Sequence, residues 1–173
     1  MLEGKNVNLN IVEREDLYIL KEWINNLNIE GEYEPILHVS IKDLEKKYDK
    51  QTEGQWYFIE KKDGTKIGYI FHMLSKSKVP VIGYAIIPSE RGNGFCSEAV
   101  QIIVDYLYLS KQIIRIQAEI DPENIASQKV LEKVGFKMEG ILRKSFFSRG
   151  NWRDSAMYSI LREEWKEARI LLI

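Results

Sequence analysis

The spacing of apolar residues divides the first third of the chain into one strand and two amphipathic helices. Residues 7–11 alternate apolar and polar side chains, the pattern of a strand with one buried face. Residues 13–26 repeat apolar positions every three or four residues and predict a helix. Ser40, with Asp43 three residues later, predicts the N-cap of a second, more polar helix that runs toward Tyr48. The apolar face of the first helix would consist of Leu17, Leu20, Trp23, Ile24 and Leu27.

The middle of the chain predicts a β-hairpin followed by a central strand. Apolar runs at residues 56–59 and 67–71 flank Asp63-Gly64, a dipeptide that tight hairpin turns favour. Residues 81–87 are almost all apolar, which is typical of a strand buried on both faces. Pro88 ends this strand, because proline lacks the amide hydrogen that a strand ladder needs.

Helices and strands alternate in the second half of the chain. Because strand–helix–strand units favour parallel pairing, we expect locally parallel strands with antiparallel hairpins around them. The predicted order of all elements is βααβββαβαββ, in one domain of the α/β (α+β) class over residues 1–173. The second-half elements are a helix at 97–109, a strand at 113–120, a helix at 125–134 that Gly135 stops, and strands at 137–147 and 155–161 joined by Arg149-Gly150-Asn151.

Composition narrows the class of protein. The 173 residues are 45% hydrophobic and 29% charged, the mix of an ordinary globular domain, and a net charge of -1 offers no general attraction to nucleic acid or anionic membrane. A single cysteine, Cys96, excludes an intrachain disulfide, and with only two histidines it leaves no convincing metal site. No apolar stretch approaches the roughly 20 residues of a spanning helix, and the start lacks the apolar run of a signal peptide. We therefore expect a cytoplasmic protein without a membrane partner.

Residues 87–99 carry the clearest indication of chemistry. A buried strand ends there, a loop with Gly92 and Gly94 follows, and an amphipathic helix begins at once. The first turn of a helix presents unsatisfied N–H groups and partial positive charge. Because glycines let the backbone approach a ligand closely, this loop suits an anionic phosphate group. The alternative is a tight strand-to-helix turn that binds nothing.

Two common phosphate-binding motifs do not match this loop. The G-x-x-x-x-G-K-[ST] pattern is absent, which argues against ATP or GTP chemistry. Gly92 and Gly94 fit the start of a dinucleotide G-x-G-x-x-G motif, but Ser97 stands at the third glycine position. A pyrophosphate carried by another molecule remains, and coenzyme A is the obvious candidate.

Several motifs resemble those of the GNAT acetyltransferase superfamily. Arg91-Gly92-Asn93-Gly94 stands where the superfamily has its [QR]-x-x-G-x-[GA] acetyl-CoA loop, and residues 124–136 are similar to its N-x-x-S-x-x-V-L-E-K-x-G-F helix. The opening residues 2–9 and the ending residues 151–161 resemble the RimJ/RimL-like N-acetyltransferase branch. The resemblance spans nearly the whole chain. It implies a single GNAT-type domain with a central mixed, mostly antiparallel twisted sheet flanked by helices.

The resemblance also implies where acetyl-CoA binds as co-substrate, without a metal. The glycine loop would hold the pyrophosphate through main-chain N–H groups, and the end of the preceding strand would pair with the pantetheine amides. Cys96 near the helix N-terminus could have a lowered thiol pKa, but it lacks a histidine partner, and an ordinary loop or core cysteine is expected. The residues expected to bind the cofactor are Ala85, Ile86, Ile87, Arg91, Gly92, Asn93, Gly94, Phe95, Cys96, Ser97 and Asn124.

The expected reaction is direct attack of a neutral amine on the thioester carbonyl. Ser127 stands where the branch places a hydroxyl near the thioester sulfur, so we expect it to be the acid, unless its hydroxyl bonds back into the helix backbone. Glu119, with Asp121 beside it, is the expected base at the end of a strand, and both could instead be solvated. Two positions depart from the family pattern, because Ser89 replaces its Gln or Arg and Leu131 replaces a proton-donating tyrosine of many relatives.

The acceptor is expected near the loop between the first two helices, where the superfamily shapes its acceptor pocket. Glu32 and Glu34 lie in this loop and could attract a cationic amine. The alternative is a solvated loop whose carboxylates bind nothing. Residues 1–60 carry 7 Lys or Arg against 13 Asp or Glu, so such an attraction would give this acidic third a purpose.

The expected function is therefore transfer of the acetyl group of acetyl-CoA to a primary amine. That amine could belong to a protein N-terminus, a polyamine, an amino acid or an antibiotic, and no nucleic-acid partner is expected. Relatives are often dimers, which makes a homodimer an expectation as well. The alternatives are a non-catalytic acyl-CoA-binding sensor or scaffold module and an enzyme that acts on nucleotide phosphates.

Overall fold

The computed structural model describes residues 1–50 and 54–170 and places their strands in one mixed sheet of 8 strands, in the order β1-β2-β3-β4-β5-β6-β8-β7. Neighbouring strands are antiparallel except β5 and β6, which are parallel. Residues 51–53 and 171–173, which the predicted domain includes, lie outside the described part. The strands are β1 (Leu2–Glu3), β2 (Val7–Ile11), β3 (Gly54–Lys61), β4 (Lys66–Leu74), β5 (Pro80–Ile86), β6 (Arg115–Ile120), β7 (Lys137–Ser148) and β8 (Asn151–Leu161).

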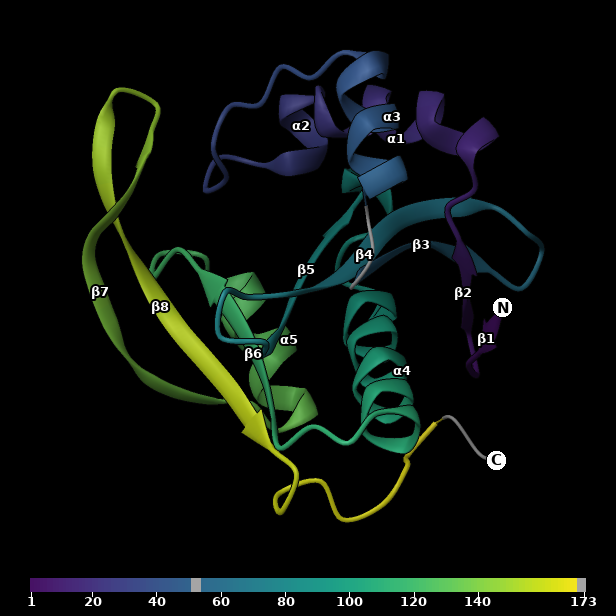
Figure 1. Ribbon diagram of the computed structural model, residues 1–173, viewed down its shortest axis with the longest axis vertical. Coiled ribbons are helices and arrows are strands. Elements are labelled where there is room, and N and C mark those ends of the chain that lie inside the picture. Colours follow the sequence, from purple (N-terminus) through teal and green to yellow (C-terminus); the bar gives the residue numbers. More distant parts are fainter. Residues whose placement is uncertain (51–53, 171–173) are drawn as a thin grey trace.

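Helices cover both faces of this sheet (Figure 1). One face carries α1 (Leu17–Ile24), α2 (Leu27–Glu30) and α3 (Ile41–Lys50), and the other carries α4 (Phe95–Ser110) and α5 (Ile125–Val134). Successive side chains of β3 point to opposite faces of the sheet and enter two different cores. Phe58 packs in the core under α1, while its neighbours Tyr57 and Ile59 pack in the core under α4. The two cores explain why the central strands are apolar at almost every position, and the predicted fold class is confirmed.

The predicted helix over residues 13–26 is wrong at both ends. Residues Arg14–Asp16 form a 3₁₀ turn before α1, and the chain leaves the helical conformation at Asn26. The side chain of Asn26 accepts a hydrogen bond from the N–H of Asn28 at 3.0 Å and caps the separate short helix α2. Leu27, expected on the buried face, is 44% exposed as a result. The break matters because it turns α2 toward the cofactor loop.

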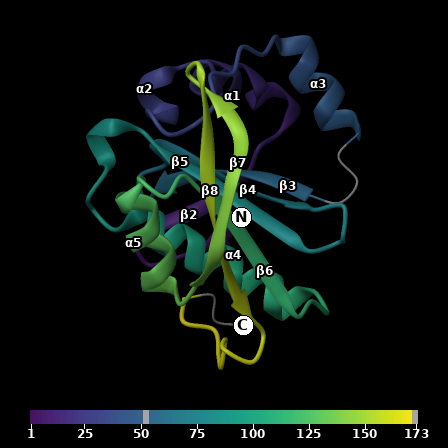
Figure 2. The ribbon, with the colours of Figure 1, turned by 90° about the vertical axis from the view of Figure 1, so that its left-hand side faces the viewer.

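The parallel pairing expected in the second half occurs once. β5, α4 and β6 form a strand–helix–strand unit with parallel strands, as predicted. After α5 the chain forms β7 at the edge of the sheet, leaving room for one strand beside β6. β8 fills this place between β6 and β7 and pairs antiparallel with both. The β7–β8 hairpin starts its second strand at Asn151, four residues earlier than predicted, and it rises beside α2 (Figures 1 and 2).

Smaller differences have local causes. The strand predicted over 81–87 ends at Ile86, because residues Pro88–Glu90 form a 3₁₀ turn capped by Ile87. The helix predicted from Ser97 begins at Phe95, since Gly94 in a left-handed conformation starts it. The strand predicted from Ile113 begins at Arg115, and the two-residue β1 was not predicted. In residues 1–50 and 54–170, no helix is long and apolar enough to cross a membrane.

Candidate functional site

The glycine loop adopts a backbone conformation that suits an anion. Gly92 and Gly94 have φ of 81° and 82°, a left-handed region that side chains other than glycine rarely adopt. Gly94 is the N-cap of α4 and supplies no side-chain cap, so the N–H groups of the first helical turn receive no side-chain partner there. A helix of 16 residues directs its positive end at this point. The loop therefore offers the main-chain donors that a pyrophosphate needs.

Beside the loop, the two central strands separate. The parallel strands β5 and β6 pair only at Val81 with Gln117, although β5 continues to Ile86 and β6 to Ile120. Beyond this pair, one edge of β5 has no strand partner among the described residues. An extended ligand with amide groups can pair with such an edge as an additional strand.

The main chain that faces this gap belongs to even-numbered residues of β5. Because the N–H of Ile87 donates to the carbonyl of Ile67 at 2.9 Å, odd residues of the antiparallel ladder direct their main chain to β4. Ala85, expected to pair with pantetheine, therefore faces β4, and Tyr84 and Ile86 face the gap. The carbonyl of Ile86 already accepts from Arg91 Nε at 3.0 Å. Tyr84 is the residue that the sequence analysis missed, because strand alternation alone gives no absolute register.

The side chain of Arg91 extends toward α2. Its guanidinium donates to the carbonyls of Asn28 at 3.0 Å and Ile29 at 2.8 Å. These bonds, with the one to Ile86, connect the cofactor loop to the helix that borders the acceptor side. The Arg91 guanidinium is thus engaged with main-chain carbonyls, although the sequence analysis expected it to bind the cofactor.

The remaining loop residues divide between core and surface. Ser97 is buried and the Cys96 thiol packs against the larger core, while Asn93 donates to the carbonyl of Glu90 at 3.3 Å. Burial raises the pKa of Cys96 to about 12, so the helix N-terminus does not activate this thiol. The expectation of an ordinary core cysteine agrees with this position. Phe95 packs at the margin of the same core.

Asn124 and Ser127 lie together at the start of α5. Asn124 Oδ1 accepts a hydrogen bond from the N–H of Ser127 at 3.1 Å, so this oxygen caps the helix. The hydroxyl of Tyr84 reaches the carbonyl of Ser127 at 3.4 Å, and burial raises the pKa of Tyr84 well above its ordinary value. Leu131, which stands in place of the family's tyrosine, is fully buried in the core. Tyr84 and Ser127 are therefore the hydroxyl groups near the gap.

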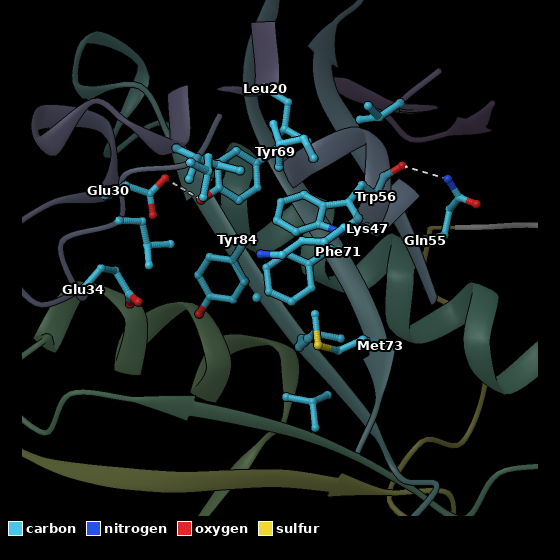
Figure 3. Close-up of a pocket in the computed structure, with 18 of the residues that line it drawn as sticks. Leu20, Glu30, Glu34, Lys47, Gln55, Trp56, Tyr69, Phe71, Met73 and Tyr84 are labelled. Atoms are coloured by element: carbon cyan, nitrogen blue, oxygen red, sulfur yellow. Dashed lines mark hydrogen bonds between the residues drawn. The ribbon is translucent and has the colours of Figure 1, made fainter. Parts of the chain in front are cut away.

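A cavity of about 400 Å³ opens where β5 and β6 separate, and it extends under α1, α2 and α3. Ser127 and Glu119 border it on the side of β6 and α5, and aromatic rings form its floor. Figure 3 shows Trp56, Tyr69, Phe71 and Tyr84 gathered around its centre. Trp56 stacks on Phe71 with ring centroids 4.4 Å apart, which makes a rigid, flat surface.

Two carboxylates lie at one side of this cavity. The hydroxyl of Tyr69 donates to Glu30 Oε1 at 2.5 Å, and Glu34 lines the wall nearby (Figure 3). Burial raises the pKa of Glu30 to about 7, against the opposing effect of the Tyr69 hydrogen bond, and the charge of Glu34 adds to the rise. Burial, with the charge of Asp121, also raises the pKa of Glu34. Both carboxylates can bind an ammonium ion, and Glu30 can accept its proton near neutral pH.

Of the predicted acceptor and base residues, the structure brings some together and separates others. Glu34 lines the cavity, whereas Glu32 is exposed outside it. Glu119 borders the cavity and its carboxylate accepts from Ser155 Oγ at 3.3 Å. Asp121 is buried and forms an ion pair with Arg153 at 2.5 Å. Glu30 was missed, since nothing in the sequence shows that α2 would direct it inward.

Two hydrogen bonds from the β7–β8 hairpin hold the segment after α2, next to these carboxylates. Arg149 Nη2, at the tip of the β7–β8 hairpin, donates to the carbonyl of Gly31 at 2.9 Å. Ser148 Oγ donates to the carbonyl of Glu34 at 3.1 Å. The hairpin thereby supports the acceptor side from residues more than a hundred positions away. In the described ranges, no three His, Cys, Asp or Glu side chains gather closely enough to hold a metal ion.

The fold and site together define a class, the transferases that bind an acyl-CoA between two splayed parallel strands. A family model for the acetyltransferase (GNAT) domain matches residues 13–137. The chain belongs to the GNAT acetyltransferase family and is an N-acetyltransferase that uses acetyl-CoA. Family membership favours the enzyme over the non-catalytic module and the nucleotide-phosphate enzyme.

Individual relatives agree with this assignment. The probable N-acetyltransferase YjcK of Bacillus subtilis is 32% identical over 127 residues, which is 72% of this chain and 70% of that protein. The uncharacterized N-acetyltransferase YnaD of the same organism is 38% identical, but over only 49% of each chain. The spermidine N(1)-acetyltransferase of Escherichia coli is 28% identical over 95% of this chain and 91% of its own length.

Solved structures share the fold. The spermidine N-acetyltransferase of Vibrio cholerae, solved with CoA and spermine, superposes with a TM-score of 0.82 at 24% identity. The superposition covers 92% of this chain and 98% of that one. The arrangement of sheet and helices therefore extends through β7 and β8, beyond the residues that the family model matches.

Proposed function

We propose that this enzyme acetylates a small aliphatic primary amine, with acetyl-CoA in the gap between β5 and β6 and the amine in the adjoining cavity. The observation that carries the proposal is the placement of Glu30 and Glu34 inside the cavity that begins at the gap. Half-buried carboxylates attract an ammonium group, and the aromatic floor favours an aliphatic chain or a cation. Support also comes from the E. coli relative, whose name gives spermidine as its substrate.

The cofactor would be held mainly by backbone. In this proposal the N–H groups of residues 92–97 bind the pyrophosphate, and Tyr84 with Ile86 pairs with the pantetheine amides. Asn124 would donate its amide nitrogen to the pantetheine arm while its oxygen caps α5. When bound, acetyl-CoA supplies the activated acyl group, and the protein supplies position and proton transfer.

Proton transfer needs one group to accept a proton from the ammonium and one to donate to the departing thiolate. We assign the first role to Glu30, because its raised pKa lets it take a proton near pH 7 and its carboxylate lies inside the cavity. Ser127 keeps the predicted donor role, with the adjacent Tyr84 hydroxyl as a second candidate. Glu119 as the base stays a prediction that the same experiment tests.

Thiol release from acetyl-CoA against a panel of amines tests the proposal. The panel includes spermidine, a monoamine of similar length, amino acids and an N-terminal peptide. Glu30→Gln should lower kcat by about 10²–10⁴-fold with little change in the KM for acetyl-CoA. The matched control is Glu32→Gln, which makes the same substitution at an exposed carboxylate outside the cavity. Equal loss in Glu119→Gln with none in Glu30→Gln would reassign the base, and turnover of peptides alone would overturn the acceptor class.

Two further expectations from the sequence stay predictions. Strand β7 at the edge of the sheet exposes Met138, Ile141, Leu142 and Phe147, an apolar edge that supports the expected homodimer. Light scattering on the purified chain measures its mass directly, and a monomer at micromolar concentration would contradict the dimer. A cytoplasmic location rests on the sequence alone.

A further inference from the structure

One side chain of the protein enters its own acceptor cavity. Lys47 lies on α3, one turn after the buried Leu44, and both residues line the cavity. Figure 3 shows the Lys47 side chain crossing the cavity beside Trp56 and Phe71, with its nitrogen directed toward Tyr84. Among the described residues that line the cavity, Lys47 is the sole basic side chain.

Lys47 has no carboxylate partner in an ion pair among the described residues, unlike several lysines elsewhere in the fold. Lys21, Lys61 and Lys66 form ion pairs with carboxylates on the surface, and Lys47 forms none of the ion pairs found within the described ranges. Hydrogen bonds from Ser40, one of them at 2.6 Å, and then the charges of Lys46 and Lys47 lower the pKa of Asp43, which lies one turn earlier on α3. The Lys47 side chain is exposed, so its ammonium keeps contact with solvent while the side chain extends over the cavity.

The position of this amine corresponds to the one assigned above to the substrate. A primary amine on a four-carbon chain crosses the aromatic floor toward the side that holds Glu30 and Glu34 (Figure 3). The same cavity is bordered by Ser127 and Glu119 and opens into the gap beside β5. A tethered amine of this kind reacts far faster than a free one, because its encounter with the thioester costs no translational entropy.

We propose that the enzyme acetylates Lys47 itself, by an intramolecular reaction with acetyl-CoA in its own site. The inference rests on the proposed function, since it needs acetyl-CoA in the gap and the amine in the cavity. Lys46 and Lys50 on the same helix do not line the cavity and stay unmodified.

The atoms balance as in the reaction with a free amine. The Lys47 ammonium loses one proton to a cavity carboxylate, and its nitrogen attacks the carbonyl carbon of the thioester. The new C–N bond forms, the C–S bond breaks, and the second proton of the nitrogen goes to the departing thiolate. The products are Nε-acetyl-Lys47 and CoA, and the carboxylate returns its proton to solvent.

Acetylation removes the positive charge of Lys47 from the cavity. A cationic acceptor then no longer meets a like charge on the aromatic floor. The modified enzyme would therefore bind a polyamine with a lower KM than the unmodified enzyme.

Mass spectrometry of the purified native chain tests the inference. The chain is incubated with isotopically labelled acetyl-CoA and no amine, and peptides are mapped at several times. Lys47 should acquire label at least about ten times faster than Lys46 or Lys50, at a rate per molecule that does not change with enzyme concentration. Lys47→Arg should lose the adduct and Lys46→Arg should keep it.

The outcomes separate the two proposals. If the native enzyme releases CoA with free amines but Lys47 remains unlabelled, the self-acetylation is wrong and the proposed function stands. If free amines give no CoA release and Lys47 is also unlabelled, the proposed function itself fails. Equal labelling of Lys46, Lys47 and Lys50 indicates chemical acetylation in solution, and a rate that rises with enzyme concentration indicates transfer between molecules. Either result overturns the intramolecular reaction.

Discussion

The cofactor loop and the acceptor cavity are adjacent, yet they are built in opposite ways. Residues 88–97 form a continuous segment in which two glycines and a helix start supply main-chain donors. The cavity is assembled from α1, α2, α3, four strands and α5, and it uses side chains. A ligand that every family member shares suits a backbone site, which few substitutions can alter. A variable acceptor suits a side-chain site, where single substitutions change charge and shape.

Arg91 connects these two regions. Its side chain leaves the cofactor loop and binds the carbonyls of α2, the helix that carries Glu30. The two regions therefore differ in construction but are joined mechanically. Variants of each region should separate cofactor affinity from acceptor chemistry.

The largest effect on cofactor affinity is expected at Gly92. Gly92→Val places a β-branched residue at φ 81°, which strains or rearranges the loop, and CoA affinity should fall by at least about 100-fold. Isothermal titration with CoA measures this loss. The control is Gly64→Val in the β3–β4 turn, since Gly64 has φ 86° and, like Gly92, nothing within 4 Å of an added Cβ. Unchanged CoA affinity in Gly92→Val would refute the phosphate role of the loop.

The next effect concerns pH in the acceptor region. With the pKa of Glu30 at about 7, kcat should fall by about tenfold per pH unit below 7, as the base becomes protonated. Initial rates from pH 5.5 to 9 measure this acidic limb of the kcat profile, and Glu30→Gln should abolish the fall in kcat below pH 7. A limb that persists unchanged in Glu30→Gln would assign it to another group.

Glu30 also links pH to stability. Its folded pKa lies above its ordinary value of 4.5, so the native state binds more protons between these values and stability falls as pH rises from about 4.5 to about 7. Glu30→Gln removes the half-buried charge and should stabilise the protein by on the order of 1–2 kcal/mol at pH 8, with little change at pH 4.5. Denaturant unfolding at both pH values measures the difference. Equal stability changes at the two pH values would show that the carboxylate is not buried as described.

A smaller effect is expected where the two regions meet. Ser127→Ala should lower kcat by about tenfold and leave CoA affinity nearly unchanged, because its hydroxyl acts on the departing thiolate. Tyr84→Phe provides the comparison, since the Tyr84 hydroxyl lies 3.4 Å from the Ser127 carbonyl. The variant with the larger loss of kcat identifies the donor. No loss in Ser127→Ala would remove it from the mechanism.

The smallest effect on catalysis should come from Arg91, which connects the cofactor loop to α2. Arg91→Ala leaves three carbonyls without their donor, which should lower stability by about 1–3 kcal/mol and raise the KM for the amine several-fold. CoA affinity should change less than the amine KM does. Steady-state kinetics in both substrates measure the two effects, with Arg14→Ala in an exposed ion pair as control. A selective loss of CoA affinity would show that the guanidinium contacts phosphate instead.

The amino-acid sequence by itself determined most of the elements and the position of the glycine loop. Hydrophobic periods located most strands and helices, because burial on a sheet face or helix face repeats locally, and the loop at Gly92 and Gly94 was readable because its conformation depends on neighbouring residues. Boundaries failed where one capping side chain decided them, as at Asn26.

Only the tertiary structure decided the acceptor side. Glu30 became a candidate base because α2 breaks away from α1, Arg91 and Arg149 hold it, and Tyr69 from β4 meets its carboxylate. Each of these contacts joins residues tens of positions apart. The pKa of Glu30 is raised mainly because the elements that meet there cover its carboxylate. Periodicity reports which face of an element is buried. It carries no information about which distant side chains share the cavity.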